Sequence, residues 1–263
     1  MLLRIIVCIK QVLDPEAPTS AYAIDSEGNR VTVKGAPPVL SPFDENALEA
    51  ALRIKDSHNS KITVISMGRN LAKPVLRKSL AAGADELLLL EDDAFGDTDS
   101  WGTAFILATA IKKMGEYALI FTGLQAADSN LGAVGSGIAE ILHIPSITSC
   151  RKVQVNDGKV MVERVVSDGY EVIEACLPVL LTVSNELGDL RSINIKEMVE
   201  AQKKPITVWK AQDLGIELSE MRRIKLLGLF IPKKESKCEI VNGETPEEMG
   251  ANLALKLRQT EVI

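Results

Sequence analysis

The sequence predicts an α/β fold in which a mostly parallel sheet is flanked by helices. Short apolar runs typical of buried strands alternate with helical patterns four times within about the first 145 residues. A strand–helix–strand order of this kind makes the strands parallel, with right-handed crossovers and helices on both faces. The chain has 263 residues, of which 46% are hydrophobic and 25% charged, as in an ordinary globular protein.

The first half supplies these strands and helices in turn. Ser41 is a suitable N-cap for the first helix, Pro42 fits its first position, and Asp44 suits its positive end. A hairpin with its turn at residues 26–29 is expected before that helix. The expected strands are 2–9, 61–67, 86–91 and 118–122; the expected helices are about 42–55, 72–82, 100–114 and the stretch that Pro145 ends.

After Pro145 the pattern changes to a hairpin-containing second half and an extended C-terminal arm. Residues 152–165 alternate strictly around Asn156-Asp157-Gly158, which is a strong hairpin signal. A strand over 178–183, a helix over 193–203 and a turn at 214–215 are expected next.

The C-terminal arm begins with a polar linker at residues 232–237. Its last helix has Thr245 as N-cap, Pro246 in first position and Glu248 at the capping-box position. We therefore expect one domain over 1–231, with a polar loop and helix at about 184–204, and a linker and helix over 232–263. The last helix packs either on a partner subunit or on its own domain, and both alternatives stay open.

The overall charge and hydropathy exclude some classes of partner. A net charge of −6 argues against nucleic acid as the main partner. No apolar run approaches the length of a membrane span, and residues 1–7 fit the start of a strand rather than a signal peptide. A cytoplasmic protein is the expectation.

Cysteine and histidine are too few and too scattered for the common kinds of metal or hydrolytic site. The cysteines form no C-x-x-C pair and are expected to be buried free thiols; they are Cys8, Cys150, Cys176 and Cys238. The two histidines, His58 and His143, rule out a multi-histidine metal site. Both fit a surface or helix-end position, which argues against a hydrolytic triad.

A glycine-rich elbow follows the strand at 118–122. Polar side chains come first, at Gln125 and at residues 128–130, and glycines follow at positions 132, 135 and 137. Such an elbow lets backbone N–H groups approach a phosphate at a helix start, or it serves tight packing. The pattern is neither a Walker loop nor a G-x-G-x-x-G fingerprint.

The elbow is one of four strand ends that should meet at one edge of the sheet. Three of the four are small or polar enough to admit a ligand, and ligands gather at such edges. This convergence favours a nucleotide site. The strand ends are Cys8–Gln11, Ser66–Gly68, Glu91–Asp93 and Thr122–Asp128.

The sequence resembles the small (β) subunit of electron-transferring flavoproteins over nearly its whole length. It looks closer to the bifurcating and nitrogen-fixation-type groups than to the conventional group. No single motif carries the resemblance, but the ordered set does. The motifs are VCIKQV at 7–12, SPFDENALEAALRIK at 41–55, LAAGAD at 80–85, GLQAADSNLGAVG at 123–135, AEILHIP at 139–145, DLRSINI at 189–195 and GETPEE at 243–248.

The resemblance implies an adenine-nucleotide-binding α/β fold and a heterodimer with a larger α subunit that carries FAD. In the conventional group the β-subunit pocket holds AMP. In the bifurcating group it holds a second FAD, which exchanges a hydride with NAD(H), and electrons are split between a flavin dehydrogenase and a low-potential acceptor such as ferredoxin. The implied lining residues are Cys8, Ile9, Lys10, Leu40, Ser41, Phe43, Asp44, Met67, Thr122, Gly123, Gln125, Asp128, Ser129, Asn130, Leu131, Gly132, Ala133, Val134 and Gly135.

Two positions decide the expected content of the pocket. Residues 44–49 and 94–99 look closer to the bifurcating group. However, Leu131 and Ala133 stand where that group usually has Thr and Gln, so two side-chain contacts to phosphate are lost while backbone donors remain. We expect a second FAD, with AMP as the alternative.

The small chain is expected to contribute no catalytic residue, because a flavin itself carries the electrons. Arg191 matches an arginine that projects towards the α-subunit flavin in this family, where a cation would stabilise the reduced, anionic flavin. The alternative role is a surface salt bridge.

Docking to a partner dehydrogenase is expected around the family's apolar anchor. The partner-binding residues are Leu190, Ile195 and Met198. Glu200 and Gln202 stand where the conventional group usually has lysines, so the partner surface has changed. An acyl-CoA dehydrogenase and a 2-hydroxyacid (lactate or glycolate) dehydrogenase both remain possible partners.

Two other classes of protein fit the same architecture. An ATP pyrophosphatase-like enzyme should carry a Ser-Gly-Gly-x-Asp-Ser loop after the first strand, and residues 8–11 lack it. A nucleotide sensor that uses AMP without redox chemistry would lack a flavin-bearing partner.

Overall fold

The computed structural model describes residues 2–25, 30–217, 222–231, 238–260 and 262. The chain divides into two compact units, Met1–Leu227 and Gly228–Ile263. The first unit contains the sheet, and the second contains helix α7 (Pro246–Gln259). The expected turn at 26–29 and the expected linker at 232–237 lie outside the described residues.

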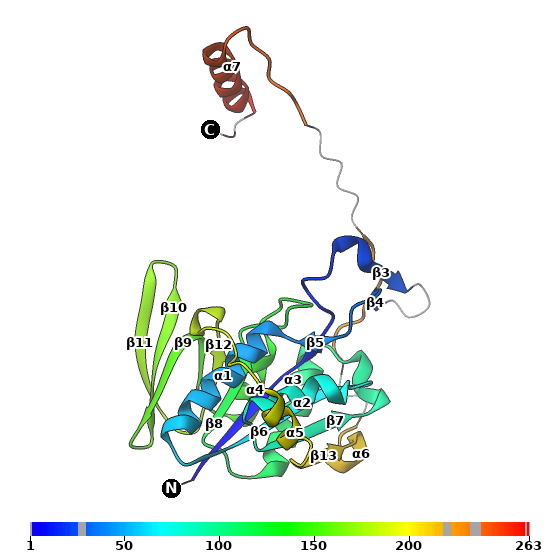
Figure 1. Cartoon of the computed structure of the whole chain (residues 1–263), viewed down its shortest axis with the longest axis vertical. Helices are drawn as coiled ribbons and strands as arrows, with labels where there is room; N and C mark the ends of the chain where they lie inside the picture. Colours follow the sequence, from blue (N-terminus) through cyan, green and yellow to red (C-terminus); the bar gives the residue numbers. More distant parts are fainter. Residues whose placement is uncertain (1, 26–29, 218–221, 232–237, 261, 263) are drawn as a thin grey trace. The chain divides into compact units, whose positions relative to one another are not determined.

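The first unit is built on a sheet that has nine strands among the described residues (Figure 1). Its order is β11-β10-β9-β12-β8-β1-β6-β7-β13. Along this order, every neighbouring pair between β9 and the edge strand β13 is parallel. At the other edge, β9, β10 and β11 form an antiparallel meander. The strands are β1 (Leu3–Cys8), β6 (Ser60–Gly68), β7 (Glu86–Glu91), β8 (Leu119–Gly123), β9 (Ser146–Asn156), β10 (Lys159–Val166), β11 (Gly169–Cys176), β12 (Val179–Val183) and β13 (Ile206–Trp209).

The order of the strands reverses between β1 and β8. From β1 the chain proceeds outward to β6 and β7, then returns to place β8 on the other side of β1. Helices leave the two sides of such a point in opposite directions, which opens a crevice outside the carboxyl ends of the two strands. The ends of β1 and β8, at Cys8 and Gly123, therefore lie where folds of this kind bind their ligands, and this position is called the crevice below.

Helices cover both faces of the sheet and enclose two hydrophobic cores (Figure 1). Ile5 and Val7 of β1 point to one core, and Ile6 and Cys8 point to the other, because successive side chains alternate across a strand. The first core contains residues of α1 (Pro42–Ser57) and α2 (Lys73–Ala82); the second contains residues of α3 (Ser100–Met114) and α4 (Val134–Leu142). The α/β prediction is confirmed.

Shorter elements complete the described structure. Two small antiparallel pairs precede α1, and three 3-10 turns and two short helices lie in the connections. The pairs are β2 (Gln11–Val12) with β5 (Val39–Leu40) and β3 (Tyr22–Asp25) with β4 (Arg30–Val33); the other elements are η1 (Thr19–Ala21), η2 (Asp93–Asp97), η3 (Asn185–Leu187), α5 (Ile195–Ala201) and α6 (Ala211–Leu214).

The expected hairpin after Pro145 is confirmed, and one predicted helix is shorter than expected. Asp157 and Gly158 have φ of 46° and 77°, the left-handed values that a tight two-residue hairpin turn requires. The helix predicted over 193–203 begins only at Ile195. Asn194 accepts a hydrogen bond from Glu197 N, and the Glu197 side chain accepts one from Asn194 N, so a capping box fixes the start.

Strands β11 and β13 are missing from the sequence prediction. β11 is an outer strand whose side chains are at least partly exposed on both faces, so its apolar pattern is weak. β13 has only four residues. Its place is set by parallel pairing with the buried strand β7, a long-range contact that no local pattern reports.

The predicted burial of two cysteines is wrong. Ser41 occupies the N-cap of α1 as predicted, although its hydroxyl makes no capping bond there. Cys8 and Cys150 are buried as expected, whereas Cys176 and Cys238 are exposed. Cys176 ends the outer strand β11, and Cys238 lies in the second unit. Neither side chain is therefore covered by a hydrophobic core.

The two histidines follow the prediction of helix-end positions. His58 is the C-cap of α1, and His143 is the C-cap of α4 with φ of 54°. No helix among the described residues is long and apolar enough to span a bilayer.

The start of helix α3 holds the segment that leaves the first unit. Asp99 caps the helix by accepting from Gly102 N at 2.8 Å, and it also accepts from Arg223 N at 2.6 Å and Ile224 N at 2.7 Å. The Arg223 guanidinium lies 3.9 Å from the centre of the Trp101 ring. This double attachment fixes where the apolar run 224–231 begins.

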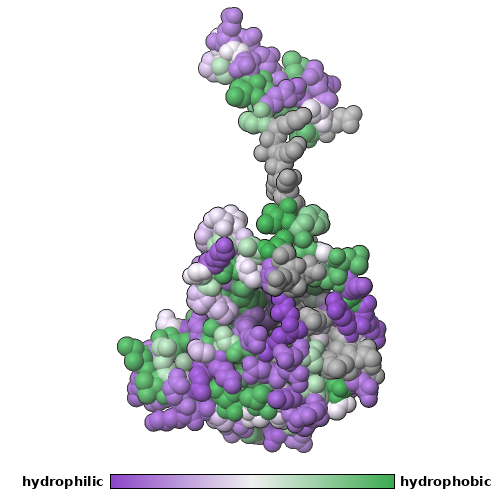
Figure 2. Space-filling view, turned by 90° about the vertical axis from the view of Figure 1, so that its right-hand side faces the viewer, coloured by the Kyte–Doolittle hydropathy of each residue, from purple (hydrophilic) through white to green (hydrophobic). Residues whose placement is uncertain are grey.

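Exposed apolar side chains are scattered over most of the surface. Figure 2 shows hydrophobic residues mixed with hydrophilic ones over the face that it presents. The larger groups lie in the run 224–231, on α5, on α7 and on the outer strands β10 and β11.

The end of β8 packs so closely on the start of α1 that only glycine fits at position 123. A Cβ there would lie 2.5 Å from Asp44 Oδ1 and 2.7 Å from the backbone of Phe43. We therefore expect Gly123→Ala to lower the free energy of unfolding by about 2 kcal/mol or more, because backbone must move. Urea unfolding measures the change.

A second glycine serves as the control. A Cβ at Gly250 in α7 would meet nothing within 4 Å. Gly250→Ala should therefore be neutral or slightly stabilising, as alanine is favoured over glycine within a helix. Equal unfolding curves for wild type and Gly123→Ala would refute the close approach.

Candidate functional site

Asp44, in the first turn of α1, ties the two sides of the crevice together. Its Oδ2 accepts from Lys10 N at 2.8 Å, just beyond β1, and its Oδ1 accepts from Gly123 N at 3.0 Å, at the end of β8. The side chain reaches both because α1 begins beside the two strand ends (Figure 1). One carboxylate thus links the backbone beyond β1 to the end of β8 at the switch point.

The environment of Asp44 makes it the unusual titratable group of the crevice. Burial raises its pKa to about 7, although the N–H groups of Lys10 and Gly123 and the charge of Lys10 act in the opposite direction. Burial and the nearby Asp44 raise the pKa of the Cys8 thiol to about 12. Cys8 is therefore a protonated, inert thiol at neutral pH and no nucleophile.

The elbow after β8 presents an uncapped helix start. The N-cap of α4 is Ala133, which has no side-chain acceptor for the first-turn N–H groups. The preceding loop reaches α4 through left-handed residues, Asn130 with φ of 53° and Gly132 with φ of 62°. A helix start of this kind favours an anion.

The glycines of the elbow have different roles. Gly132 supplies the left-handed conformation, and a Cβ on Gly135 would lie 2.6 Å from Thr122 Oγ1 and 2.7 Å from Thr182 Cγ2. Gly135 therefore serves tight packing of α4 on β8 and β12. For Gly135, the expectation of tight packing is therefore confirmed. A phosphate at the helix start stays a prediction.

Two more contacts connect the elbow to the other wall of the crevice. Lys10 Nζ forms an ion pair with Asp128 Oδ2 at 2.6 Å, and Ala127 N donates to Ser41 Oγ at 3.4 Å. Ser41 N in turn donates to Lys10 O at 2.9 Å. The end of β1, the start of α1 and the elbow therefore form one hydrogen-bonded rim.

Most of the predicted lining residues lie on or near this rim. Cys8, Ile9, Leu40, Thr122 and Gly123 are buried at the strand ends, and residues 128–133 are exposed on the elbow. The prediction omits Gln11, which donates to Asn70 O at 2.7 Å and accepts from Ala72 N at 2.6 Å. Gln11 thus fastens the loop after β6, and the predicted residue Met67 lies near the end of that strand. The sequence does hold one indication of this role, because Gln11 places a polar amide just after an apolar strand.

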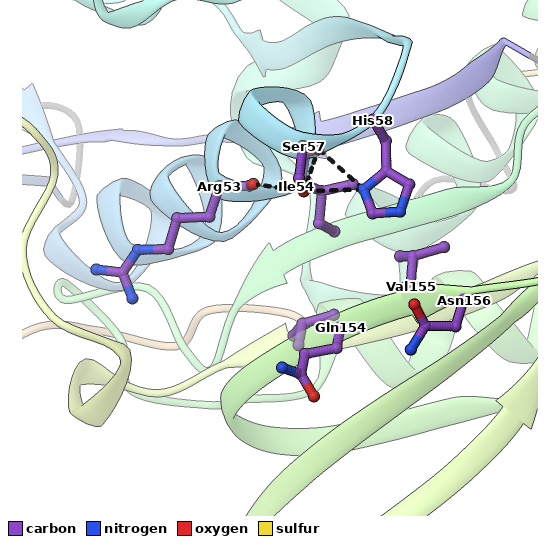
Figure 3. Close-up of a pocket in the computed structure, with 8 residues that line it drawn as sticks. Arg53, Ile54, Ser57, His58, Gln154, Val155 and Asn156 are labelled. Carbon is purple, nitrogen blue, oxygen red and sulfur yellow. Dashed lines mark hydrogen bonds between the residues drawn. The ribbon is translucent and has the colours of Figure 1, made fainter.

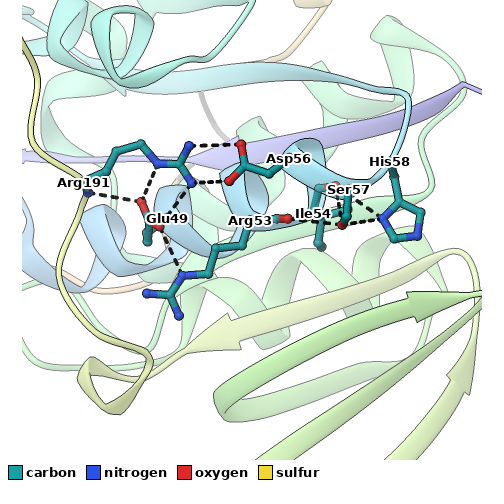
Figure 4. A network of polar contacts seen from close by, with 7 residues as sticks. All are labelled: Glu49, Arg53, Ile54, Asp56, Ser57, His58 and Arg191. Carbon is teal, nitrogen blue, oxygen red and sulfur yellow. Dashed lines mark hydrogen bonds and ion pairs between the residues drawn. The ribbon is translucent and has the colours of Figure 1, made fainter.

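Arg191 lies apart from the crevice, in an ion-pair network on the side of α1 (Figure 4). Its guanidinium bonds both oxygens of Glu49, at 3.0 and 3.2 Å, and both oxygens of Asp56, at 2.8 and 3.1 Å. Burial of Glu49 raises its pKa, but hydrogen bonds from Arg191 and Arg53 outweigh this, so the pKa is lowered. Arg191 is therefore a fixed structural cation in this chain, and a role towards a flavin stays a prediction.

A small cavity at the other end of α1 does not fit a nucleotide. It measures about 190 Å³ and lies between the end of α1 and β9 (Figure 3). Its lining residues are Arg53, Ile54, Ser57, His58 and residues 153–156. Its one cation, Arg53, is held by Glu49 and by Leu187 O. Across the described part of the chain, no three His, Cys, Asp or Glu side chains gather as metal ligands.

The predicted docking residues differ in exposure. Ile195 is 81% exposed and Met198 is 57% exposed on α5, whereas Leu190 is partly buried against the first core. The prediction omits Val199, which is as exposed as Met198. The exposed apolar surface of α5, made of Ile195, Met198 and Val199, is called the α5 surface below.

The raised pKa of Asp44 predicts a particular pH dependence of stability. The folded chain binds the Asp44 proton more tightly than the unfolded chain, whose pKa is near 3.8, so this group makes the free energy of unfolding fall as pH rises from about 4 to about 7. Asp44→Asn lacks this contribution. The stability difference, wild type minus variant, should therefore decline through this window and be constant above about pH 8.

Urea unfolding at a series of pH values measures this difference. Asp168→Asn, which removes an exposed carboxyl beside the β10–β11 turn, is the control for the loss of one charge. If the difference in the free energy of unfolding between wild type and Asp44→Asn stays constant from pH 4 to 8, the pKa of Asp44 is not raised by burial.

Comparison with known proteins gives a consistent family. The sequence model of the electron transfer flavoprotein domain matches residues 30–214. The chain is 38% identical to the caffeyl-CoA reductase-Etf complex subunit CarD of Acetobacterium woodii, over 99% of this chain and 100% of the relative. It is 40% identical to the electron transfer flavoprotein subunit beta of Thermoanaerobacterium thermosaccharolyticum, with the same coverage.

A relative from a nitrogen-fixation-type group also matches. Protein FixA of Azorhizobium caulinodans is 34% identical over 82% of this chain and 78% of the relative. The resemblance found in the motifs is thus confirmed over the length of the chain. The chain belongs to the electron transfer flavoprotein family, among its β subunits.

Proposed function

We propose that this chain is the β subunit of a heterodimer, in which a larger α subunit carries FAD and electrons pass to or from a partner dehydrogenase. The observation that carries the proposal is the switch point between β1 and β8 in the strand order, in a chain that matches flavoprotein β subunits end to end. The α/β layers, the uncapped start of α4 and the rim around Asp44 support a nucleotide there.

The nucleotide that we favour is a second FAD. The likeness to CarD and FixA supports the bifurcating group, in which NAD(H) would be the redox substrate and ferredoxin a low-potential acceptor. A flavin supplies one- or two-electron chemistry when bound, and this chain would orient it and exclude water. The protonated Cys8 thiol and the hydrogen-bonded Asp44 fit a site that binds rather than catalyses.

AMP is the alternative occupant, and one observation favours it. Leu131 is 68% exposed on the elbow, and neither it nor Ala133 can donate a side-chain hydrogen bond to a second phosphate. Backbone N–H groups at the start of α4 would then hold one phosphate alone. In that case the chain would be a conventional electron carrier without bifurcation.

The partner surfaces follow from the exposed apolar groups. The α5 surface, with Leu190 at its base, would dock the dehydrogenase, and the name of the CarD complex supports an acyl-CoA class of substrate over a 2-hydroxyacid. The segment 232–263 with α7 would pack on the α subunit, and Arg191 would face its flavin. We expect the heterodimer to act in the cytoplasm.

The flavin content of the purified heterodimer tests the pocket. Co-expression with the α subunit should give a coloured complex with about two FAD per heterodimer. The visible spectrum and the flavin-to-protein ratio measure this, and chromatography of the released nucleotides detects AMP. A ratio near one with AMP would establish the alternative, and a colourless complex would refute the flavoprotein assignment.

The α5 surface is tested by electron transfer to the dehydrogenase. Ile195→Ala should raise the Michaelis constant for the dehydrogenase about tenfold, because a central apolar anchor is lost, and should leave the flavin content unchanged. Val172→Ala on β11 removes a similarly exposed apolar side chain and is the control. Equal kinetics for the two variants would argue against docking at α5.

A further inference from the structure

Lys10 has a fixed backbone and a side chain that faces the elbow. Its N–H is held by Asp44 and its carbonyl by Ser41 N, at 2.8 and 2.9 Å. Its ammonium pairs with Asp128 at 2.6 Å, and both side chains are partly exposed, 47% for Lys10 and 34% for Asp128. The pair therefore lies at the surface of the rim, where solvent or a ligand can reach it.

The charges around the crevice make Lys10 important for an anionic ligand. Asp44 and Asp128 both bring carboxylates to the rim. Apart from its burial, Asp44 is influenced by both neighbours: Lys10 lowers its pKa and Asp128 raises it, so the three charges lie within electrostatic reach. Lys10 is the one cation among the predicted lining residues. The other cation predicted to face a cofactor, Arg191, is occupied by Glu49 and Asp56 on α1.

We propose that Asp128 takes the place of the ligand's phosphate in the free chain, and that Lys10 exchanges Asp128 for this phosphate when a nucleotide binds. The inference rests on the proposed nucleotide site and names a phosphate ester as the chemical group recognised. Asp128 is thus an internal competitor, and Lys10 the residue that distinguishes a nucleotide from a nucleoside.

Elementary electrostatics favours the exchange. The phosphate monoester of AMP carries nearly two negative charges at neutral pH, and the diphosphate of FAD carries two over its two phosphates, whereas Asp128 carries one at most. The ammonium is therefore attracted more strongly to the ligand. The lysine stem is flexible enough to turn from one partner to the other. Asp128 is exposed, so water solvates its carboxylate after the exchange at little cost.

The experiment compares AMP, FAD and adenosine as probes for the full-length chain. Calorimetric titration should show that Lys10→Met weakens AMP and FAD binding about tenfold, a loss of about 1.4 kcal/mol, and leaves adenosine binding unchanged. Asp128→Asn should strengthen AMP and FAD binding about threefold, again without an effect on adenosine. In the Lys10→Met background, Asp128→Asn should give no gain, because its effect acts through Lys10.

A matched ion pair supplies the control. Lys78 Nζ pairs with Glu45 at 2.6 Å, and the Lys78 side chain is 48% exposed, close to the values for Lys10. Lys78→Met should therefore leave all three affinities unchanged. Thermal unfolding of every variant verifies that the fold is retained.

Three results would overturn the inference. AMP and FAD affinities that survive Lys10→Met would show that the phosphate does not use this ammonium. A parallel loss of adenosine binding would show that Lys10 shapes the pocket instead. If the wild-type chain binds neither AMP nor FAD, the inference falls together with the nucleotide site, whereas the first two results leave the proposed function intact.

Discussion

The geometry of the crevice depends on one buried carboxylate. Asp44 accepts hydrogen bonds from the ends of β1 and β8, which are adjacent in the sheet but about 110 residues apart in sequence, and it does so from the first turn of α1. Ionising a buried carboxyl is costly, and here two backbone N–H groups offset part of that cost while burial still raises the pKa. The same contacts leave glycine as the residue that fits at position 123. The placement of α1 and the rim of the crevice therefore depend on the same carboxyl group.

The sequence was sufficient for most of the fold because local signals and buried strands coincide in this protein. Runs such as residues 86–91 and 118–122 are apolar at successive positions, as strands buried on both faces must be. The predictions failed where structure comes from long-range pairing. β13 exists because β7 offers an edge, and β11 continues the meander with few buried side chains. The exposed Cys176 and Cys238 show that residue type alone does not determine burial.

The candidate site could be located from the sequence but not built in detail. Strand ends and glycines point to the switch point, and the predicted lining residues lie mostly there. No local pattern reveals that Asp44 bonds two distant backbones, that Lys10 pairs with Asp128, or that Arg191 is held by Glu49 and Asp56. Each of these contacts joins segments more than 30 residues apart. A charged residue at a helix start indicates only a favourable dipole until the fold shows its partner.

The attachment of residues 223–224 to the start of α3 also allows intrinsic tryptophan fluorescence to report on this segment. The sequence has two tryptophans, and each ring faces a cation: Arg223 over Trp101 at 3.9 Å and Lys113 over Trp209 at 4.9 Å. The first cation belongs to the segment that leads out of the first unit; the second lies on α3 and faces the edge strand β13. Detachment of residues 223–224 from Asp99 would change the field around Trp101 alone. Trp209 would then serve as an internal reference, so the emission of the unlabelled protein separates movement of this segment from changes elsewhere in the fold.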